Sequence, residues 1–297
     1  MDLGLYPGLS FERYSSLERI NISNLKEMVR SPLHYRYRCA HQRESTALSM
    51  GRSAHAAVLE PERFERDYVV WDEVTDAGKM SPRRGKKFDA FCEFHKGKIV
   101  VEPKEHRFAC NVRDAVRAKP VARKYLDGEG TRELTLLWDD VETKAPCKGR
   151  LDLVTHVEGV DVIVGLKTDR DLTPRTFSAK AARLLYHLQW GFYYDAFSTV
   201  TGREPRVVEI CVETEPPHDV TVYVIPSDVI EVGREQYREL LAKHRECERS
   251  KRWPGRSDNE VVFELPAYLQ RDDEDLTDLD LDEGSLRRAA DALNEDL

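Results

Sequence analysis

The sequence lacks the features of a membrane protein and those of a metal-clustered or disulfide-rich domain. No apolar run approaches the roughly 18 residues that a membrane-spanning helix needs. The N-terminus, "MDLGLYPGLSFERYSS", has no basic head followed by an apolar stretch, so no signal peptide is expected. The six cysteines are scattered singly, without a C-x-x-C pair, which disfavours a structural zinc site or an iron–sulfur cluster. We therefore expect a cytoplasmic protein with reduced thiols and no membrane partner.

The sequence also lacks a net positive charge, which taken alone disfavours nucleic acid as a partner. The formal net charge is −8. However, residues 272–283, "DDEDLTDLDLDE", hold eight acids and no base, and without them the formal charge rises from −8 to zero. A locally basic groove is compatible with that balance. We expect a single domain over residues 1–270, with a helical part up to about residue 126, and an acidic, disordered tail over 271–297 that includes a short amphipathic stretch at 284–295.

The periodicity of apolar residues changes part-way along the chain. Helices are predicted first, at 22–30 with Ser23 as N-cap, at 48–64, and at 106–126 with a break near Pro120. Three closely spaced β-type stretches come next, at 132–140, 148–157 and 161–168, and predict a meander. A helix at 178–202, strands at 206–214 and 219–226, and a helix at 227–249 begun by Ser227 complete the order. This order predicts an α/β protein whose mixed central sheet is flanked by helices.

Two neighbouring predicted strands carry a carboxylate and an ammonium group. Asp152 lies in "KGRLDLV" and Lys167 in "VGLKTD". Strand alternation is expected to place Arg150 with Asp152 on one face, and Gly165 with Lys167 on one face of the next strand. A carboxylate beside an ammonium group at the end of a sheet suits a Mg²⁺ site with a nucleophilic water. The alternative, judged on this hairpin alone, is a surface cross-strand ion pair worth less than about 1 kcal/mol.

Six short segments, in a fixed order, resemble one nuclease family. They are "ISNLKEMVRSPLHYRY", "MGRSAHAAVLEP", "KGRLD", "VGLKT", "YHLQWGFYYDAF" and the ending "WPG…ELPAYL", and they span most of residues 20–269. The ordered set resembles the RecE-like and RecB-like exonucleases of the PD-(D/E)XK superfamily, in their phage or prophage form. The resemblance implies a restriction-endonuclease-like core, Mg²⁺ or Mn²⁺ as cofactor, and DNA as substrate.

The resemblance also implies roles for the residues of the metal site. Asp152 matches the first metal carboxylate, and Lys167 matches the catalytic lysine. His55, in "GRSAH", matches a histidine beside the metal, and the backbone carbonyl of Leu166 is a further candidate ligand. Glu133, in "TRELTLLW", matches an acidic residue on the preceding strand; its alternative is an exposed strand carboxylate.

Gln189 and Tyr193 lie one helical turn apart in "YHLQWGFY" and match the Q-x-x-x-Y helix that covers the catalytic site and contacts DNA in this family. Their alternative is a polar edge on a core helix. The basic stretch "SPRRGKKF" offers Arg83, Arg84 and the further cations Lys86 and Lys87 as phosphate contacts, as does Arg150 near the site. The alternative for the basic stretch is a solvated loop.

Gly165 departs from the family pattern. The pattern has Asp or Glu two residues before the lysine, and glycine has no side chain to bind a cation. Asp161 and Asp169 share the strand parity of Gly165, but each is four residues away, or roughly 13 Å, which is too far for a direct ligand. Metal affinity and cleavage are therefore expected to be impaired, and Gly165→Asp is expected to restore them. Either this family member is naturally inactive or one substitution disables an active enzyme.

Three functions remain open from the sequence. The first is a RecE-type exonuclease that resects linear duplex DNA 5′→3′ and hands the 3′ overhang to a single-strand annealing protein, acting as a homo-oligomer. The second is a catalytically inactive DNA-end-binding or scaffolding protein on a nuclease fold. The third is a structural protein without a nucleic-acid partner. Substrate, polarity, partner and oligomeric state in the first case are implied by the resemblance alone.

Overall fold

The computed structural model describes residues 1–41, 46–74 and 80–265, and the chain forms two compact units, Met1–Arg256 and Ser257–Leu297. The described part of the second unit, residues 257–265, contains no helix or strand. The predicted acidic tail and its amphipathic stretch lie outside the described residues. No helix in the described part of the chain is both long and apolar enough to cross a membrane.

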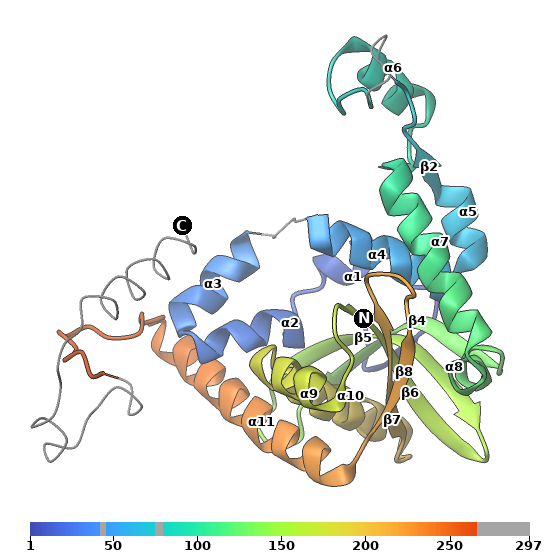
Figure 1. Ribbon diagram of the computed structural model, residues 1–297. Helices are drawn as coiled ribbons and strands as arrows, with labels where there is room; N and C mark the ends of the chain where they lie inside the picture. The colour runs from blue at the N-terminus through green and yellow to red at the C-terminus, as the bar shows by residue number, and fades with distance from the viewer. Residues whose placement is uncertain (42–45, 75–79, 266–297) are drawn as a thin grey trace, which may run out of the picture. The chain divides into compact units, whose positions relative to one another are not determined.

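A six-stranded mixed sheet forms the centre of the first unit, as predicted (Figure 1). The strand order is β1-β4-β5-β6-β7-β8, with β1 at Gly4–Tyr6, β4 at Gly130–Asp139, β5 at Pro146–Val157, β6 at Val160–Asp169, β7 at Arg206–Glu213 and β8 at Val220–Ile225. All neighbours pair antiparallel except β6 and β7, which run parallel. The parallel pair needs a crossover, which two helices between β6 and β7 supply. The predicted meander and the two later strands are confirmed; β1 was not predicted.

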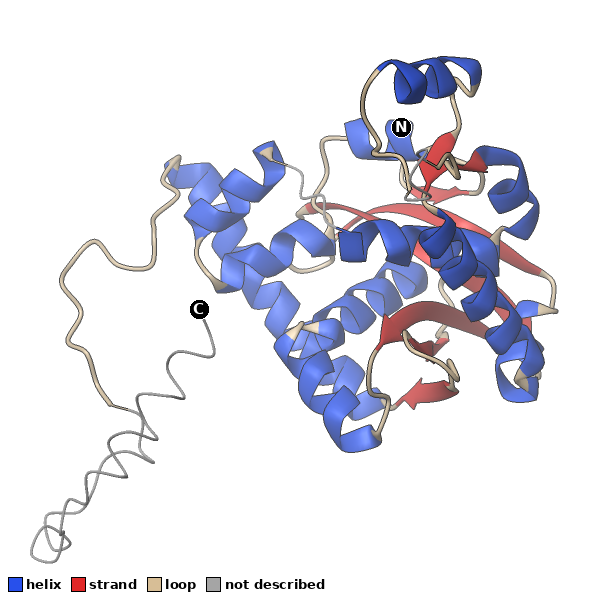
Figure 2. Cartoon of the chain, turned by 45° about the horizontal axis from the view of Figure 1, so that its top comes forward, coloured by secondary structure: helices blue, strands red, loops and turns tan. Residues whose placement is uncertain are grey.

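Helices cover both faces of the sheet (Figures 1 and 2). One face packs against α2 (Ile22–Leu25), α10 (Tyr186–Thr201) and α11 (Ser227–Ser250), and the other against α4 (Thr46–Leu59), α7 (Pro103–Ala118) and α8 (Pro120–Leu126). The alternation along β6 shows the division. Ile163 packs in the α10 cluster, whereas Val162 and Val164 pack in the α7 cluster. Gly165 and Lys167 share the parity of Ile163 and therefore belong to the α10 side.

The remaining elements lie around this core. They are α1 (Phe11–Ser16), the 3₁₀ helix η1 (Lys26–Val29), α3 (Pro32–Ala40), α5 (Pro61–Asp67), β2 (Tyr68–Val70), α6 (Lys86–Phe94), β3 (Ile99–Val101) and α9 (Pro174–Arg183). Strands β2 and β3 form a separate parallel pair that carries α6. We call residues 68–74 and 80–101 the α6 arm. It extends away from the central sheet (Figure 1).

Several predicted helices differ from the observed ones. The predicted helix at 178–202 is two helices, because Leu185 takes a left-handed conformation with φ 56° between α9 and α10. The helix predicted at 48–64 is interrupted at Pro61, which begins α5. The N-cap of α2 is Asn21, whose side chain accepts from the backbone N–H of Asn24 at 2.9 Å, and not Ser23. The predicted break at Pro120 is confirmed by the boundary between α7 and α8.

Candidate active site

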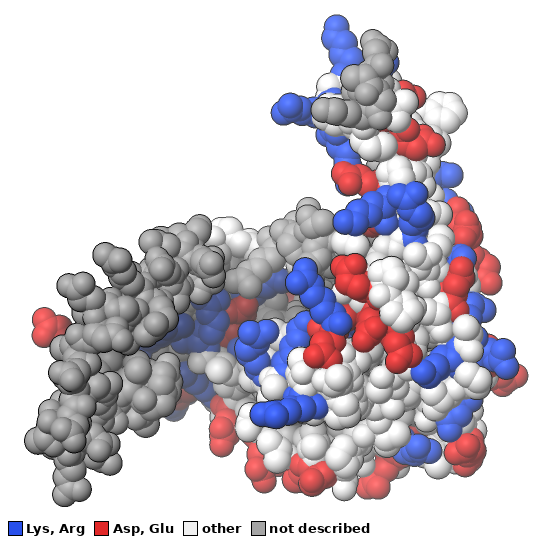
Figure 3. Space-filling model, viewed as in Figure 1, with Lys and Arg blue, Asp and Glu red and all other residues white. Residues whose placement is uncertain are grey.

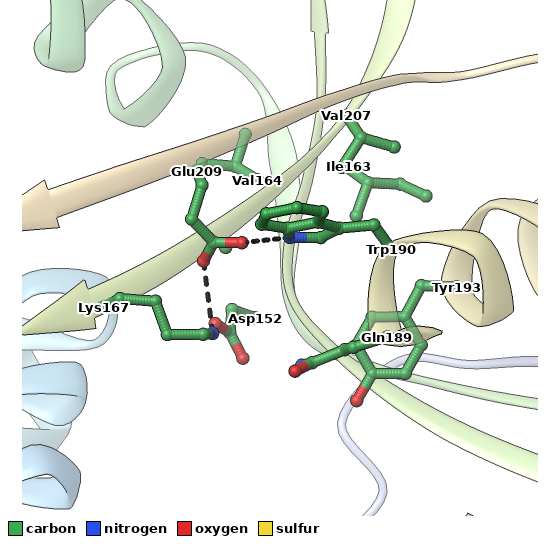
Figure 4. Close-up of a pocket in the computed structure, with 10 residues that line it drawn as sticks. Asp152, Ile163, Val164, Lys167, Gln189, Trp190, Tyr193, Val207 and Glu209 are labelled. Atoms are coloured by element: carbon green, nitrogen blue, oxygen red, sulfur yellow. Dashed lines mark hydrogen bonds and ion pairs between the residues drawn. The ribbon is translucent and has the colours of Figure 1, made fainter. Parts of the chain in front are cut away.

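A buried ion pair joins Lys167 on β6 to Glu209 on β7. The Lys167 Nζ lies 3.1 Å from Glu209 Oε1, and the Trp190 indole donates a hydrogen bond to Glu209 Oε2 at 2.6 Å (Figure 4). The Glu209 side chain is 2% exposed. Its Oε1 atom has no hydrogen-bond partner among the described residues. Among the described residues, one oxygen of this carboxylate thus accepts from Trp190, and the other is paired with the Lys167 ammonium group.

The charges of the site keep Lys167 protonated. Burial of the ammonium group by itself lowers the pKa of Lys167, but the carboxylates of Glu209 and Asp152 outweigh burial and raise this pKa above its usual value. A lysine in this state is a fixed positive charge and does not act as a proton acceptor at neutral pH.

Asp152 lies where β5 and β6 separate. The ladder between these strands ends at the pair Leu153 and Val164, and the Asp152 carboxylate accepts the next backbone N–H, that of Leu166, at 3.0 Å. His55 on α4 places Nδ1 3.7 Å from the same carboxylate oxygen. The Leu166 carbonyl faces the Lys167 ammonium group at 3.4 Å. His55, Leu166 and Lys167 therefore all lie next to Asp152.

Side-chain alternation breaks at Asp152, which strict strand parity did not predict. Leu151 packs in the α10 cluster and Leu153 in the α7 cluster, although the two have the same parity. Across the ladder, Glu133 interrupts β4 with φ 52°, a conformation that costs energy for a residue with a side chain. The irregularity on both strands explains how the Asp152 carboxylate reaches the gap between β5 and β6 instead of standing on a face of the sheet.

Arg150 engages Glu133. Its Nε donates to Glu133 Oε2 at 2.5 Å, and its Nη1 donates to the Leu9 carbonyl at 2.7 Å. Burial, then the nearby Asp152 charge, raises the pKa of Glu133, and Arg150 opposes that rise. The Arg150 guanidinium thus positions Glu133 and hydrogen-bonds to acceptors within the protein. Glu133 is a half-buried carboxylate close to Asp152.

Helix α10 covers this cluster. Gln189 and Tyr193 project from it toward Asp152 (Figure 4), and both line a small cavity of about 10 Å³. The other polar residues that line the cavity are Asp152, Lys167, Glu209 and the indole of Trp190. A volume of this size is at the lower limit for one water molecule or ion. Burial raises the pKa of Tyr193 well above its usual value, so its hydroxyl remains protonated.

Sequence reasoning missed Lys26, a second lysine near the cluster. Its Nζ donates to the Leu184 carbonyl at 3.2 Å and lies 5.4 Å from the ring centre of Tyr186. Burial, followed by the positive charge of Lys167, lowers the pKa of Lys26 to about 7, while Glu209 opposes that change. Lys26 lies in the segment "ISNLKEMVRSPLHYRY", which resembles the nuclease family, but the resemblance gives this lysine no role. Its position beside Lys167 depends on the tertiary fold.

The position of Glu209 bears on the expectation for Gly165→Asp. Gly165 and Glu209 are paired across β6 and β7. A Cβ atom at Gly165 would lie 2.2 Å from Glu209 Oε1, so the space of the missing side chain is already filled by a carboxylate. An aspartate at residue 165 therefore requires the Glu209 carboxylate to move, which the sequence did not indicate, and the effect of Gly165→Asp stays a prediction.

The donor atoms of the site decide whether it fits a divalent cation. The part of the chain that the structure describes contains no cluster of three or more His, Cys, Asp and Glu side chains that could hold a metal ion. Mg²⁺ does not need such a cluster, because it commonly binds one or two carboxylates and keeps several waters. Asp152 and the buried carboxylate of Glu209 line one cavity and offer oxygen donors of the required kind. The residues present fit Mg²⁺ or Mn²⁺.

The basic residues of the α6 arm are not part of this cluster. Arg83, Arg84, Lys86 and Lys87 are all exposed. Arg83 in addition donates to the Val100 carbonyl at 2.6 Å. Lys and Arg side chains are visible at the end of the molecule that carries α6 (Figure 3).

Comparison with known proteins decides the family. Residues 21–264 match the PDDEXK-like domain of unknown function (DUF3799). The chain belongs to this family. A solved structure from Eubacterium rectale, described as a candidate exonuclease, shares 13% identity with this PDDEXK-like protein at a TM-score of 0.58, covering 88% of this chain and 96% of that one. The likeness shows a shared nuclease-type fold.

Two other solved structures resemble the PDDEXK-like chain only weakly. The protein SSO0001 has a TM-score of 0.33 at 14% identity, covering 77% of this chain and 81% of that one. VC1899 from Vibrio cholerae has a TM-score of 0.21 at 13% identity, covering 76% and 56%. No curated protein matches the sequence.

Proposed function

We propose that this PDDEXK-like protein is a divalent-metal-dependent nuclease that resects linear duplex DNA from an end, as the RecE-type exonucleases that it resembles do. The observation that carries the proposal is the convergence of Asp152 and Lys167 beneath Gln189 and Tyr193 in one cavity. These four side chains come from two strands and the helix that covers them, in the order that the resemblance implies.

The geometry supports separate roles for the residues. Bound Mg²⁺ or Mn²⁺ would supply an activated water and offset charge on the phosphate. Lys167, which remains protonated, would stabilise the negative charge that develops on the phosphoryl oxygens. Gln189 and Tyr193 would orient the scissile phosphate from above, through an amide and a protonated hydroxyl. Lys26, with a pKa of about 7, would add a phosphate contact whose charge depends on pH near neutrality.

The finer parts of the proposal rest on the resemblance. They are 5′→3′ digestion, transfer of the 3′ overhang to a single-strand annealing protein, and a homo-oligomeric assembly. The α6 arm, which presents Arg84, Lys86 and Lys87, is proposed to contact the duplex backbone.

The test compares a linear duplex with a covalently closed circle of the same sequence, in Mg²⁺, Mn²⁺ and EDTA. The linear duplex should be degraded in the presence of metal and the circle should survive. With 5′→3′ polarity, a 5′ label should be released early, while a 3′-labelled strand shortens progressively. Lys167→Met should abolish degradation, because it removes the ammonium group that stays protonated beside Asp152.

Lys119→Met is the matched control, because Lys119 forms an ion pair with Asp219 at 3.1 Å outside the cavity. It should retain full activity. If the wild-type protein binds duplex ends in a salt-dependent way but cuts none under any of these conditions, the nuclease proposal is wrong and an end-binding function is left.

A further inference from the structure

Glu209 occupies the volume that a side chain at residue 165 would fill. The Cβ of any larger residue at Gly165 would lie 2.2 Å from Glu209 Oε1 and 2.7 Å from its carboxyl carbon. Real Cβ atoms do not approach other heavy atoms this closely. Glycine at 165 and glutamate at 209 are therefore coupled: the carboxylate reaches this spot because the neighbouring strand has no side chain there.

Strand geometry explains how the side chain of Glu209 on β7 can occupy the space above Gly165 on β6. Gly165 and Glu209 are directly paired in the parallel ladder, so their side chains leave the sheet on the same face. Neighbouring strands lie about 4.8 Å apart. The side chain of glutamate is one methylene longer than that of aspartate, and in this structure it leans back across that spacing over β6.

The two carboxylate oxygens of Glu209 have different partners. The indole of Trp190 fixes Oε2 at 2.6 Å, and Oε1 is buried with no hydrogen bond among the described residues. The Lys167 ammonium group, at 3.1 Å, is the cation that Oε1 faces. A buried carboxylate oxygen in this position has the acceptor capacity to bind a second cation.

We propose that Glu209 supplies the second metal-binding carboxylate of this site, in place of the acidic residue that β6 lacks at Gly165. The inference rests on the proposed nuclease function and deepens it, since the site is then complete and not disabled. Asp152 on β5 and Glu209 on β7 would hold the cation, and Lys167 would remain available to the phosphate. Trp190 is a positioning residue for Glu209.

The competing explanation is a purely structural ion pair. Burying Glu209 and Lys167 together would then satisfy two charges, with no role for a metal. The two explanations predict different metal affinities for a protein whose carboxylate is returned to β6.

The test measures Mn²⁺ binding to the full chain by titration calorimetry without DNA, and cleavage of linear duplex separately. Four proteins are compared: wild type, Glu209→Gln, Gly165→Asp, and the double variant Gly165→Asp/Glu209→Ala. Circular dichroism and thermal unfolding verify that each is folded. Glu209→Gln keeps the volume of the side chain and should weaken Mn²⁺ binding by about tenfold or more. Gly165→Asp alone should give no gain, because Glu209 fills the space.

The double variant is the deciding protein. Returning the carboxylate to β6 while removing the side chain at 209 should recover Mn²⁺ binding and cleavage lost in Glu209→Gln. If Glu209→Gln binds Mn²⁺ as tightly as wild type, or if Gly165→Asp alone creates tight binding, the inference is overturned.

Should Glu209→Gln fail to fold, recovery in the double variant still supports the inference, and a folded double variant that does not bind Mn²⁺ contradicts it. A wild-type protein that binds Mn²⁺ through Glu209 yet cuts no DNA would refute the proposed function and leave the inference standing.

Discussion

Trp190 determines where the Glu209 carboxylate lies. Its indole N–H is the hydrogen-bond donor to Glu209 Oε2, at 2.6 Å. Trp190→Phe keeps most of the ring volume but leaves that buried oxygen unpaired, which should cost about 1–3 kcal/mol of unfolding free energy. It should also weaken Mn²⁺ binding severalfold, because the carboxylate is no longer oriented. Urea denaturation and Mn²⁺ titration measure the two effects.

Trp138→Phe is the matched control for that prediction. Trp138 is also buried in the α10 cluster, packs edge-on against Phe192, and is not among the residues that line the cavity. It should lose stability without a change in Mn²⁺ affinity. Equal losses of Mn²⁺ affinity in both variants would show that Trp190 acts through packing alone.

At the same scale, local sequence indicated part of the site and could not indicate the rest. Asp152, Lys167, Gln189 and Tyr193 lie in short recognisable segments, and all four line one cavity. Glu209 lies in "RVVEICVET" with no motif around it, and its distance from Gly165 along the chain hides their pairing. Only the parallel register of β6 and β7 brings them together. The acids of β6 itself, Asp161 and Asp169, lie too far along the strand to take the place of a side chain at residue 165.

At the scale of elements, strand positions were predictable and helix continuity was not. Alternating and β-branched stretches marked the meander and the β7–β8 hairpin, because their pattern reflects burial on a sheet. The break between α9 and α10 has no breaker in its sequence: Leu184 and Leu185 are ordinary helix formers. The left-handed conformation of Leu185 therefore depends on the tertiary fold, and helix propensity does not predict it.

Charge-reversal substitutions in the α6 arm test whether this element contacts DNA. Replacing Arg84, Lys86 and Lys87 by Glu should weaken DNA binding at low salt, since phosphate contacts release counterions. Each lost contact should reduce the slope of log affinity against log salt by about 0.9. Arg83 is left unchanged, because it donates to the Val100 carbonyl and helps hold the arm. Fluorescence anisotropy over a salt series gives the slope.

A control with the same charge change is available at the end of α11. Arg245, Arg249 and Lys251 are exposed there, and their replacement by Glu changes the net charge equally. This control should leave the salt slope nearly unchanged. If it weakens binding as much as the arm variant does, the arm is only a solvated segment and the effect is one of overall charge.

At the scale of the whole molecule, the acidic segment at 272–283 sets the net charge. Its eight acids account for the formal charge of −8, and the rest of the chain is neutral. Net negative charge repels DNA over roughly a Debye length, which is about 10 Å at 0.1 M salt.

Converting all eight positions to Asn and Gln keeps the chain length and removes this repulsion. The variant should bind duplex DNA severalfold more tightly than wild type at low salt, with the difference fading at about 1 M salt, where screening is nearly complete. Thermal unfolding of the first unit, Met1–Arg256, should not change, because its core clusters lie wholly within those residues. Equal low-salt affinity in the two proteins would mean that the acidic segment does not compete with DNA, and a gain that persists at high salt would point to a specific contact in place of general repulsion.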